Sequence, residues 1–129
     1  MTIKGLHHVA IICSDYARSK RFYTEVLQFD IIEEIYRSER QSYKLDLAIP
    51  GGSQIELFSF PNPPARPTRP EAQGLRHIAF SVSNLDQQIA DLIAKDVIVE
   101  PVRVDELTGK RFTFFADPDG LPIELYESA

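Results

Sequence analysis

Short runs in which apolar and polar residues alternate recur along this chain, and this period of two is typical of β-strands with one buried face. In the first half these runs predict strands at about residues 6–13, 29–36, 43–49 and 54–60. In the second half they predict strands at about residues 75–82, 98–104, 111–116 and 121–126. After the first strand of each half, apolar residues recur at helical spacing instead: Phe22, Tyr23, Val26 and Leu27, then Leu85, Ile89, Leu92 and Ile93. Each half therefore predicts a βαβββ unit.

The two halves also repeat each other in sequence. HVAIICSDY, which begins at His8, aligns without a gap with HIAFSVSNL, which begins at His77, at an offset of 69 (77 − 8). QIELF and PIELY align in the same way, with Glu56 matching Glu124 at an offset of 68 (124 − 56). Two matches at nearly one offset predict two pseudo-symmetric copies of one unit.

A proline-rich segment separates the copies. Residues 61–70 read PNPPARPTRP, in which five of the ten residues are proline. Proline fixes φ and lacks a backbone donor, so this segment predicts a stiff linker. We expect one domain, 1–129, with module one at about 1–60, the linker at 61–74 and module two at about 75–129. Arg66, Arg69 and Arg76 flank the linker and are expected to support the surface there.

Composition narrows the class of protein. The 129 residues are 43% hydrophobic and 26% charged, which is typical of a globular domain. No apolar run approaches a membrane span and the start does not resemble a signal peptide, so we expect a cytoplasmic protein with no membrane partner. The single cysteine, Cys13, excludes an intramolecular disulfide and a cysteine-rich zinc site. A net charge of −5 argues against nucleic acid as a partner.

Four residues at repeat-related positions carry metal-binding chemistry: His8, Glu56, His77 and Glu124. Strand alternation places their apolar neighbours against the helices and turns these four side chains to the other face. A carboxylate enclosed there is costly unless it is paired or binds a metal. The four together predict a His₂Glu₂ site for one divalent metal, with Ni²⁺, Co²⁺, Zn²⁺, Mn²⁺ and Fe²⁺ all suitable.

Each ligand also has an alternative interpretation. A lone strand histidine is usually a hydrogen-bonded structural residue and a lone strand glutamate is usually solvated; the repeat favours a metal site instead. His7 competes with His8, but its repeat partner is Arg76 and strand alternation places it on the helix-packed face. Asp117 and Asp119 lie in Asp-Pro-Asp-Gly, where turn formation explains them better than metal binding.

The motifs HHVAI, SDYARSKRFYTEVLQF, IELF, GLRHIAFSV and FFADPDGLPIELYE resemble the vicinal oxygen chelate superfamily, and in particular its YaeR-like branch. This superfamily includes glyoxalase I, methylmalonyl-CoA epimerase, fosfomycin-resistance proteins, extradiol dioxygenases and bleomycin-binding proteins. The resemblance implies an α+β fold of two βαβββ modules that form a curved, partly closed mixed sheet around a metal, with the helices outside. It also implies a homodimer, in which the modules pair within one chain or by exchange between two.

The resemblance further implies the chemistry. It carries the metal positions onto His8, Glu56, His77 and Glu124; because both carboxylate positions are filled, it favours a glyoxalase-type lyase, isomerase or epimerase. Such an enzyme transfers a proton next to a carbonyl through a stabilised enediolate, and Glu56 and Glu124 are both candidates for the catalytic base. Two glutathione-contacting positions, an arginine and an asparagine in bacterial glyoxalase I, are here Ile12 and Phe60, which weakens the expectation of a glutathione substrate.

Four basic residues are candidates for contact with a small anionic substrate: Arg37, Arg40, Lys44 and Arg111. The alternative is a solvated strand face. Two other functions remain open. A dioxygenase or thiol transferase of the same fold would use only one of the carboxylates, and a non-catalytic, bleomycin-resistance-like binding protein would lack the metal set.

Overall fold

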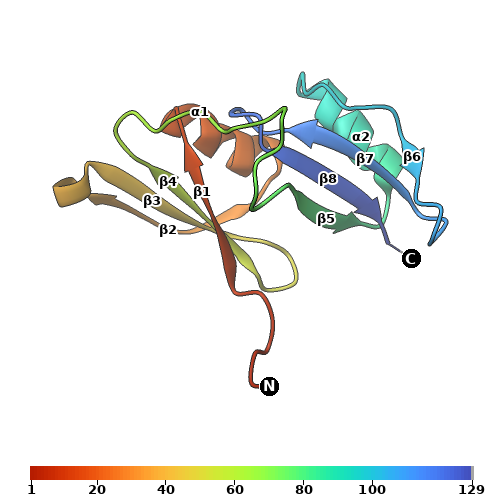
Figure 1. The fold of residues 1–129 in the computed structure, drawn as a ribbon, viewed down its shortest axis with the longest axis horizontal. Helices are drawn as coiled ribbons and strands as arrows, with labels where there is room; N and C mark the ends of the chain where they lie inside the picture. The colour runs from red at the N-terminus through yellow and green to blue at the C-terminus, as the bar shows by residue number, and fades with distance from the viewer. Residues whose placement is uncertain (129) are drawn as a thin grey trace. The chain divides into compact units, whose positions relative to one another are not determined.

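The structure, a computed structural model, describes residues 1–128. The chain forms two compact units, Met1–Ala65 and Arg66–Ala129, which divide inside the proline-rich segment. Each unit contains one four-stranded mixed sheet and one principal helix (Figure 1). The units are called module one and module two below, and each is described by itself.

Module one contains four strands, two helical segments and a short 3₁₀ turn. These are β1 (His8–Cys13), α1 (Tyr16–Arg21), η1 (Phe22–Val26), β2 (Asp30–Arg37), η2 (Ser38–Arg40), β3 (Ser42–Ala48) and β4 (Gln54–Ser59). The strand order is β1-β4-β3-β2, with β1 parallel to β4 and the other pairs antiparallel. Asp15 begins α1 as an N-cap, because its carboxylate accepts a hydrogen bond from the Arg18 backbone N–H.

Module two repeats this topology. Its elements are β5 (Ile78–Val82), α2 (Leu85–Ala94), β6 (Arg103–Val104), β7 (Arg111–Ala116) and β8 (Pro122–Glu127). The strand order β5-β8-β7-β6 matches that of module one, and β5 is parallel to β8. Asn84 caps α2 by accepting a hydrogen bond from the Gln87 backbone N–H. The predicted α+β class with a βαβββ unit in each half is confirmed, and neither sheet closes into a barrel.

Two predicted strands are shorter than expected by three residues or more, and the strand predicted at 6–13 begins two residues later, at His8. The strand predicted at 98–104 is reduced to β6, since Pro101 supplies no backbone donor and ladder pairing is confined to Arg103 and Val104. The strand predicted at 75–82 begins only at Ile78. The carbonyl groups of Leu75 and Arg76 accept hydrogen bonds from the Arg66 guanidinium instead of a neighbouring strand.

Strand alternation separates a core face from an open face in each sheet. In module one, Leu45 and Leu47 of β3 and Ile55 and Leu57 of β4 are fully buried. Helix α1 contacts β4, and α2 likewise contacts β8 in module two. Ile123 and Leu125 of β8 are the equivalent core residues. Because successive side chains point to opposite faces, the glutamate between each apolar pair projects from the open face.

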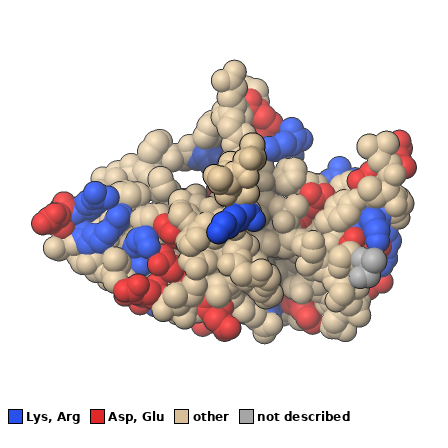
Figure 2. Space-filling view, turned by 90° about the horizontal axis from the view of Figure 1, so that it is seen from below, with Lys and Arg blue, Asp and Glu red and all other residues tan. Residues whose placement is uncertain are grey.

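Acidic and basic side chains are interspersed on the face of the molecule shown in Figure 2. Within the described part of the chain, no helix has both the length and the apolar character that a bilayer span requires.

Candidate metal centre

The structure brings His8 and Glu56 together in module one. His8 begins β1 and Glu56 lies in the middle of β4, and these strands are neighbours in the sheet. The register pairs Ala10 with Glu56, so a small side chain stands beside the carboxylate. His8 Nδ1 lies 3.3 Å from Glu56 Oε2, and the two side chains are 40% and 15% exposed. The pair is therefore accessible from the open face of the sheet.

Module two contains the equivalent pair. His77 immediately precedes β5, and Glu124 lies on the neighbouring strand β8, where the register pairs it with Ala79. His77 Nε2 lies 3.3 Å from Glu124 Oε1, and these side chains are 29% and 14% exposed. The same register and the same His–Glu separation thus occur in both modules, as the sequence repeat predicts, although His8 approaches its glutamate through Nδ1 and His77 through Nε2.

The donor atoms of each pair are compatible with one coordination shell. Two ligands about 2.1 Å from a metal and about 90–110° apart lie roughly 3.0–3.4 Å from each other. The observed separation of 3.3 Å in both pairs falls in this range. Imidazole nitrogen and carboxylate oxygen form a borderline-hard donor set, which suits first-row divalent metals. Across residues 1–128, no three His, Cys, Asp or Glu side chains are grouped to hold a metal ion.

His7 does not lie where the strand pattern places it. The prediction that it packs on the helix side does not hold, because its side chain is exposed, although its carbonyl still accepts a hydrogen bond from the Gln54 backbone N–H at 2.9 Å. His7 is exposed, and its Nδ1 lies 2.9 Å from Nδ1 of His8. The two rings meet edge to face, with centroids 5.2 Å apart. His7 therefore contacts the same His8 nitrogen that lies near Glu56.

The two glutamates have different surroundings. Lys44 Nζ lies 3.9 Å from Glu56 Oε1 and 2.7 Å from Asp46 Oδ1, so the carboxylate in module one has a cation nearby. The hydrogen bond to Asp46 raises the pKa of Lys44, which keeps the ammonium group charged. In module two, the register places Phe114 beside Glu124. The Phe114 ring also contacts His77 edge to face at 5.1 Å, so this pair has an aromatic neighbour.

The predicted substrate residues of module one occupy different places. Lys44 shares the open face with Glu56, as described above. Arg37 ends β2, donates a hydrogen bond to Ser42 Oγ at 2.9 Å, and lies over the Phe58 ring at 4.9 Å. Arg40 is exposed in the 3₁₀ turn between β2 and β3. Of these three, Lys44 lies nearest to a predicted metal ligand.

Arg111 is separated from the His77–Glu124 pair. It shares a face of β7 with the buried residues Thr113 and Phe115, whereas Phe114 beside Glu124 occupies the other face. Its guanidinium group forms ion pairs with Asp86 of α2 at 3.1 Å and with Glu127 of β8 at 2.8 Å. Arg111 therefore links α2 to the sheet of module two. It does not lie beside the His77–Glu124 pair, where a substrate contact was predicted.

We expect the Arg111→Gln variant to be less stable than the wild type at neutral pH but not at low pH. The hydrogen bonds from Arg111 lower the pKa of Glu127 in the folded protein from its ordinary value of 4.5. A lowered folded pKa contributes stability above the ordinary value, and this contribution is lost as the pH falls through the folded pKa. Melting temperatures from pH 7 to pH 2.5 measure the difference. Arg111→Lys, which keeps the charge, is the control; an unchanged difference at pH 2.5 would contradict the role of Glu127.

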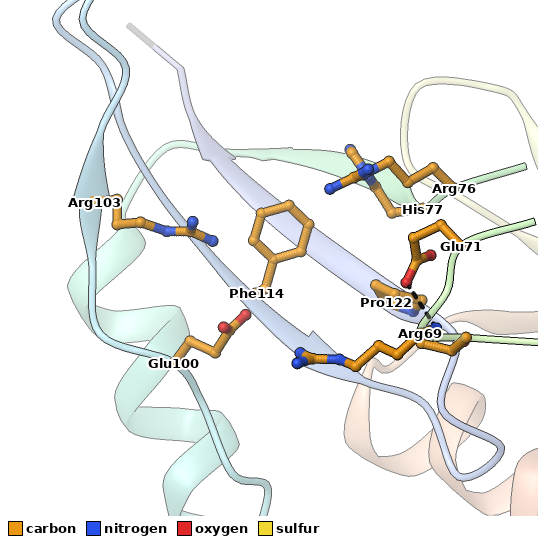
Figure 3. Close-up of a pocket in the computed structure, with 9 residues that line it drawn as sticks. Arg69, Glu71, Arg76, His77, Glu100, Arg103, Phe114 and Pro122 are labelled. Carbon is orange, nitrogen blue, oxygen red and sulfur yellow. Dashed lines mark hydrogen bonds between the residues drawn. The ribbon is translucent and has the colours of Figure 1, made fainter.

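Module two also contains a pocket that the sequence did not indicate. Its volume is about 360 Å³, and its lining includes His77, Phe114 and the three arginines Arg69, Arg76 and Arg103 (Figure 3). From the sequence, Arg69 and Arg76 were expected only to support the surface around the linker. Arg103 was not identified as a candidate site residue. The sequence did place Arg103 on a predicted strand of module two. It did not show which strand would pair with that one, so the residues around Arg103 could not be predicted.

Comparison with known proteins identifies the family to which the chain belongs. Residues 5–125 match the family described as Glyoxalase/Bleomycin resistance protein/Dioxygenase superfamily. The chain is 61% identical over 127 residues to the uncharacterized protein YwkD of Bacillus subtilis (strain 168), covering 98% of this chain and 99% of YwkD. It is 58% identical over 125 residues to the uncharacterized protein YaeR of Escherichia coli (strain K12), covering 97% of each.

More distant relatives include named enzymes. The metallothiol transferase FosB of Staphylococcus haemolyticus (strain JCSC1435) is 30% identical over 128 residues, covering 96% of this chain and 84% of FosB. Among solved structures, a glyoxalase family protein from Enterococcus faecalis is 49% identical with a TM-score of 0.92, covering 98% of this chain and 100% of that one. The trypanothione-dependent glyoxalase I of Leishmania major is 26% identical with a TM-score of 0.73, covering 97% and 87%.

Proposed function

Because the chain belongs to the glyoxalase/bleomycin resistance protein/dioxygenase superfamily, we propose that it is a metal-dependent lyase, isomerase or epimerase of glyoxalase type. Its reaction is proton transfer next to a carbonyl group in a small oxygenated substrate. The observation that carries this proposal is the pair of repeat-related His–Glu contacts, each with an N···O separation of 3.3 Å. In this proposal residues 1–129 act as one domain, and each module supplies half of the ligand set.

The residues that would hold the metal are His8, Glu56, His77 and Glu124. They would come from one chain, or from module one of one chain and module two of another in a homodimer. Either arrangement gives one site per chain. A divalent metal there supplies Lewis-acid stabilisation for the negative charge that develops on the substrate oxygens when the proton leaves.

The glutamate side chains supply the proton transfer. One carboxylate takes the proton from the carbon next to the carbonyl, and the electron pair of the broken C–H bond forms the enediolate. The same carboxylate then returns the proton to the adjacent carbon, so no external oxidant or reductant is needed. Lys44 Nζ, 3.9 Å from Glu56 Oε1, favours the negatively charged form of the Glu56 carboxylate.

The test is metal binding followed by proton exchange. Metal-free protein is titrated separately with Ni²⁺, Co²⁺, Zn²⁺, Mn²⁺ and Fe²⁺, and bound metal is measured by elemental analysis. We expect about one metal ion per chain. The loaded protein is then incubated in D₂O with small α-hydroxycarbonyl compounds, and deuterium at the carbon next to the carbonyl is followed by NMR. Binding of none of the five metals would overturn the enzyme proposal.

A second candidate function is thiol transfer, which the 30% identity to the metallothiol transferase FosB favours. Superfamily enzymes that use two histidines and one carboxylate would leave one glutamate of this chain outside the metal set. Metal binding without deuterium exchange, together with full metal affinity in one of the two Glu→Gln variants, would support this alternative over proton transfer.

A further inference from the structure

The pocket of module two lies against His77 and is rich in arginine. We propose that Arg69, Arg76 and Arg103 bind the anionic group of the substrate, a carboxylate or a phosphate, in this pocket. The inference rests on the proposed function, because His77 is one of the four proposed metal ligands. It adds the class of substrate: a small oxyanion-bearing molecule whose anionic end is held beside the metal ligands of module two.

Arg103 is held in place by aromatic rings. It stands opposite Phe112 in the β6–β7 register. Its guanidinium carbon lies 5.1 Å from the centroid of the Phe112 ring and 5.3 Å from that of Phe114. A guanidinium group that rests on ring faces keeps its N–H groups available at its edge, and those N–H groups match the two oxygens of a carboxylate or phosphate. Arg103 is thus oriented without using its hydrogen-bonding capacity.

Arg69 and Arg76 form no ion pair with any carboxylate in the described part of the chain, so their positive charges are not neutralised in this way. This contrasts with Arg111, which is paired twice. Figure 3 shows the guanidinium groups of Arg69, Arg76 and Arg103 turned toward the space around Phe114. An unpaired arginine in a pocket gains most from an oxyanion that accepts charge-assisted hydrogen bonds.

Two carboxylates, those of Glu71 and Glu100, also line the pocket and partly offset the positive charge of the arginines. Glu71 Oε1 accepts a hydrogen bond from the backbone N–H of Arg69 at 3.3 Å. The backbone N–H of Glu100 donates to the Phe114 carbonyl at 2.9 Å, which fixes that segment beside β7. Three arginines against two glutamates leave an excess of positive charge, although the whole chain carries a net charge of −5. Arginines therefore outnumber carboxylates among the residues that line the pocket, while the Glu124 carboxylate lies 3.3 Å from the lining residue His77.

The size and position of the pocket fit a small ligand. A volume of about 360 Å³ lies at the small end of the usual range for ligand sites. The Phe114 ring connects the arginines to the ligand pair, since it contacts both Arg103 and His77. An oxyanion bound by the arginines would place the rest of a short substrate next to His77. A hydroxyl or carbonyl at that end is the group that the proposed chemistry requires.

The experiment measures anion binding in metal-free full-length protein, apart from metal binding and activity. Backbone amide NMR signals are followed during titration with lactate, with its neutral amide lactamide, with glycerol 3-phosphate and with glycerol. We expect the two anions, or one of them, to shift the signals of His77 and Phe114, and the neutral partners to have no effect. Shifts with lactate alone identify a carboxylate site, and shifts with glycerol 3-phosphate alone identify a phosphate site.

The variants Arg69→Gln, Arg76→Gln and Arg103→Gln are each expected to weaken anion binding by about fivefold to tenfold, the loss of a charge-assisted contact at a partly exposed site. Arg18→Gln, on the exposed surface of α1, is the matched control and should bind as the wild type does. Equal binding of anions and neutral analogues, or pocket variants that match Arg18→Gln, would overturn the proposal. Metal titration of the same variants keeps the two proposals separate, because either binding event can fail while the other persists.

Discussion

The Glu124→Gln variant is expected to bind metal at least about 100-fold more weakly than the wild type and to lose deuterium exchange at the substrate carbon. Loss of a hydrogen-bonding neighbour of a metal ligand already weakens affinity by roughly 10–100-fold, so loss of a charged ligand should cost at least as much. Glutamine has nearly the same size, and Glu124 projects from the open face of β8, so the fold should be retained. Metal titration and NMR measure the two effects.

The repeat predicts the same loss for Glu56→Gln, because the His–Glu separation is 3.3 Å in both modules. Glu39→Gln, in the exposed turn between β2 and β3, is the matched control and should behave as the wild type does. Wild-type metal affinity in either Glu56→Gln or Glu124→Gln would contradict a four-ligand site and support the three-ligand alternative. A difference in exchange between variants that still bind metal at saturating concentration would identify the base.

The largest expected effect on stability comes from truncating the strand core. Leu57→Ala should lower the free energy of unfolding by about 2–5 kcal/mol, the usual cost of a cavity left by a buried leucine. Leu57 is fully buried on β4, next to Glu56, and β4 is hydrogen bonded to β1 on one side and β3 on the other. Urea denaturation followed by circular dichroism measures the change.

Module two offers the matched substitution, Leu125→Ala on β8, where Leu125 is 3% exposed. A loss of similar size is expected there. Ile98→Ala is the control, since this isoleucine is 90% exposed and its truncation should change stability by less than about 0.5 kcal/mol. A Leu57→Ala variant as stable as Ile98→Ala would contradict the placement of the core on this face of the sheet.

Much of the fold could be predicted from the sequence because the same pattern of strands and helix occurs in both halves of the chain. The repeat predicts two βαβββ units, the strand at Arg111–Ala116 matches its predicted bounds, and the family resemblance is confirmed by the match over residues 5–125. Both helices also begin at an N-cap side chain, Asp15 for α1 and Asn84 for α2. These features depend on local chemistry, such as alternation and capping, which a single sequence displays directly.

The features that the sequence did not predict depend on contacts between distant segments. Both faces of β7 carry apolar side chains, so alternation alone did not show that Arg111 belongs to the core-side face with Thr113. The arginine pocket joins residues from the linker, β6 and β7, and no local pattern connects Arg69 with Arg103. The strand predicted to begin at residue 6 begins at His8, and the exposure of His7, which alternation assigned to the helix-packed face, was also not predicted.

The parallel pairing of the first and last strands has a consequence for how each module folds. In module one His8 and Glu56 are separated by 48 positions (56 − 8), and in module two His77 and Glu124 by 47 (124 − 77), yet each pair lies on adjacent strands. The first strand of a module reaches its partner only when a long loop closes, a slow non-local step. The donor pair therefore does not preexist in the unfolded chain. A ligand that needs both donors favours the completed sheet and resists its opening.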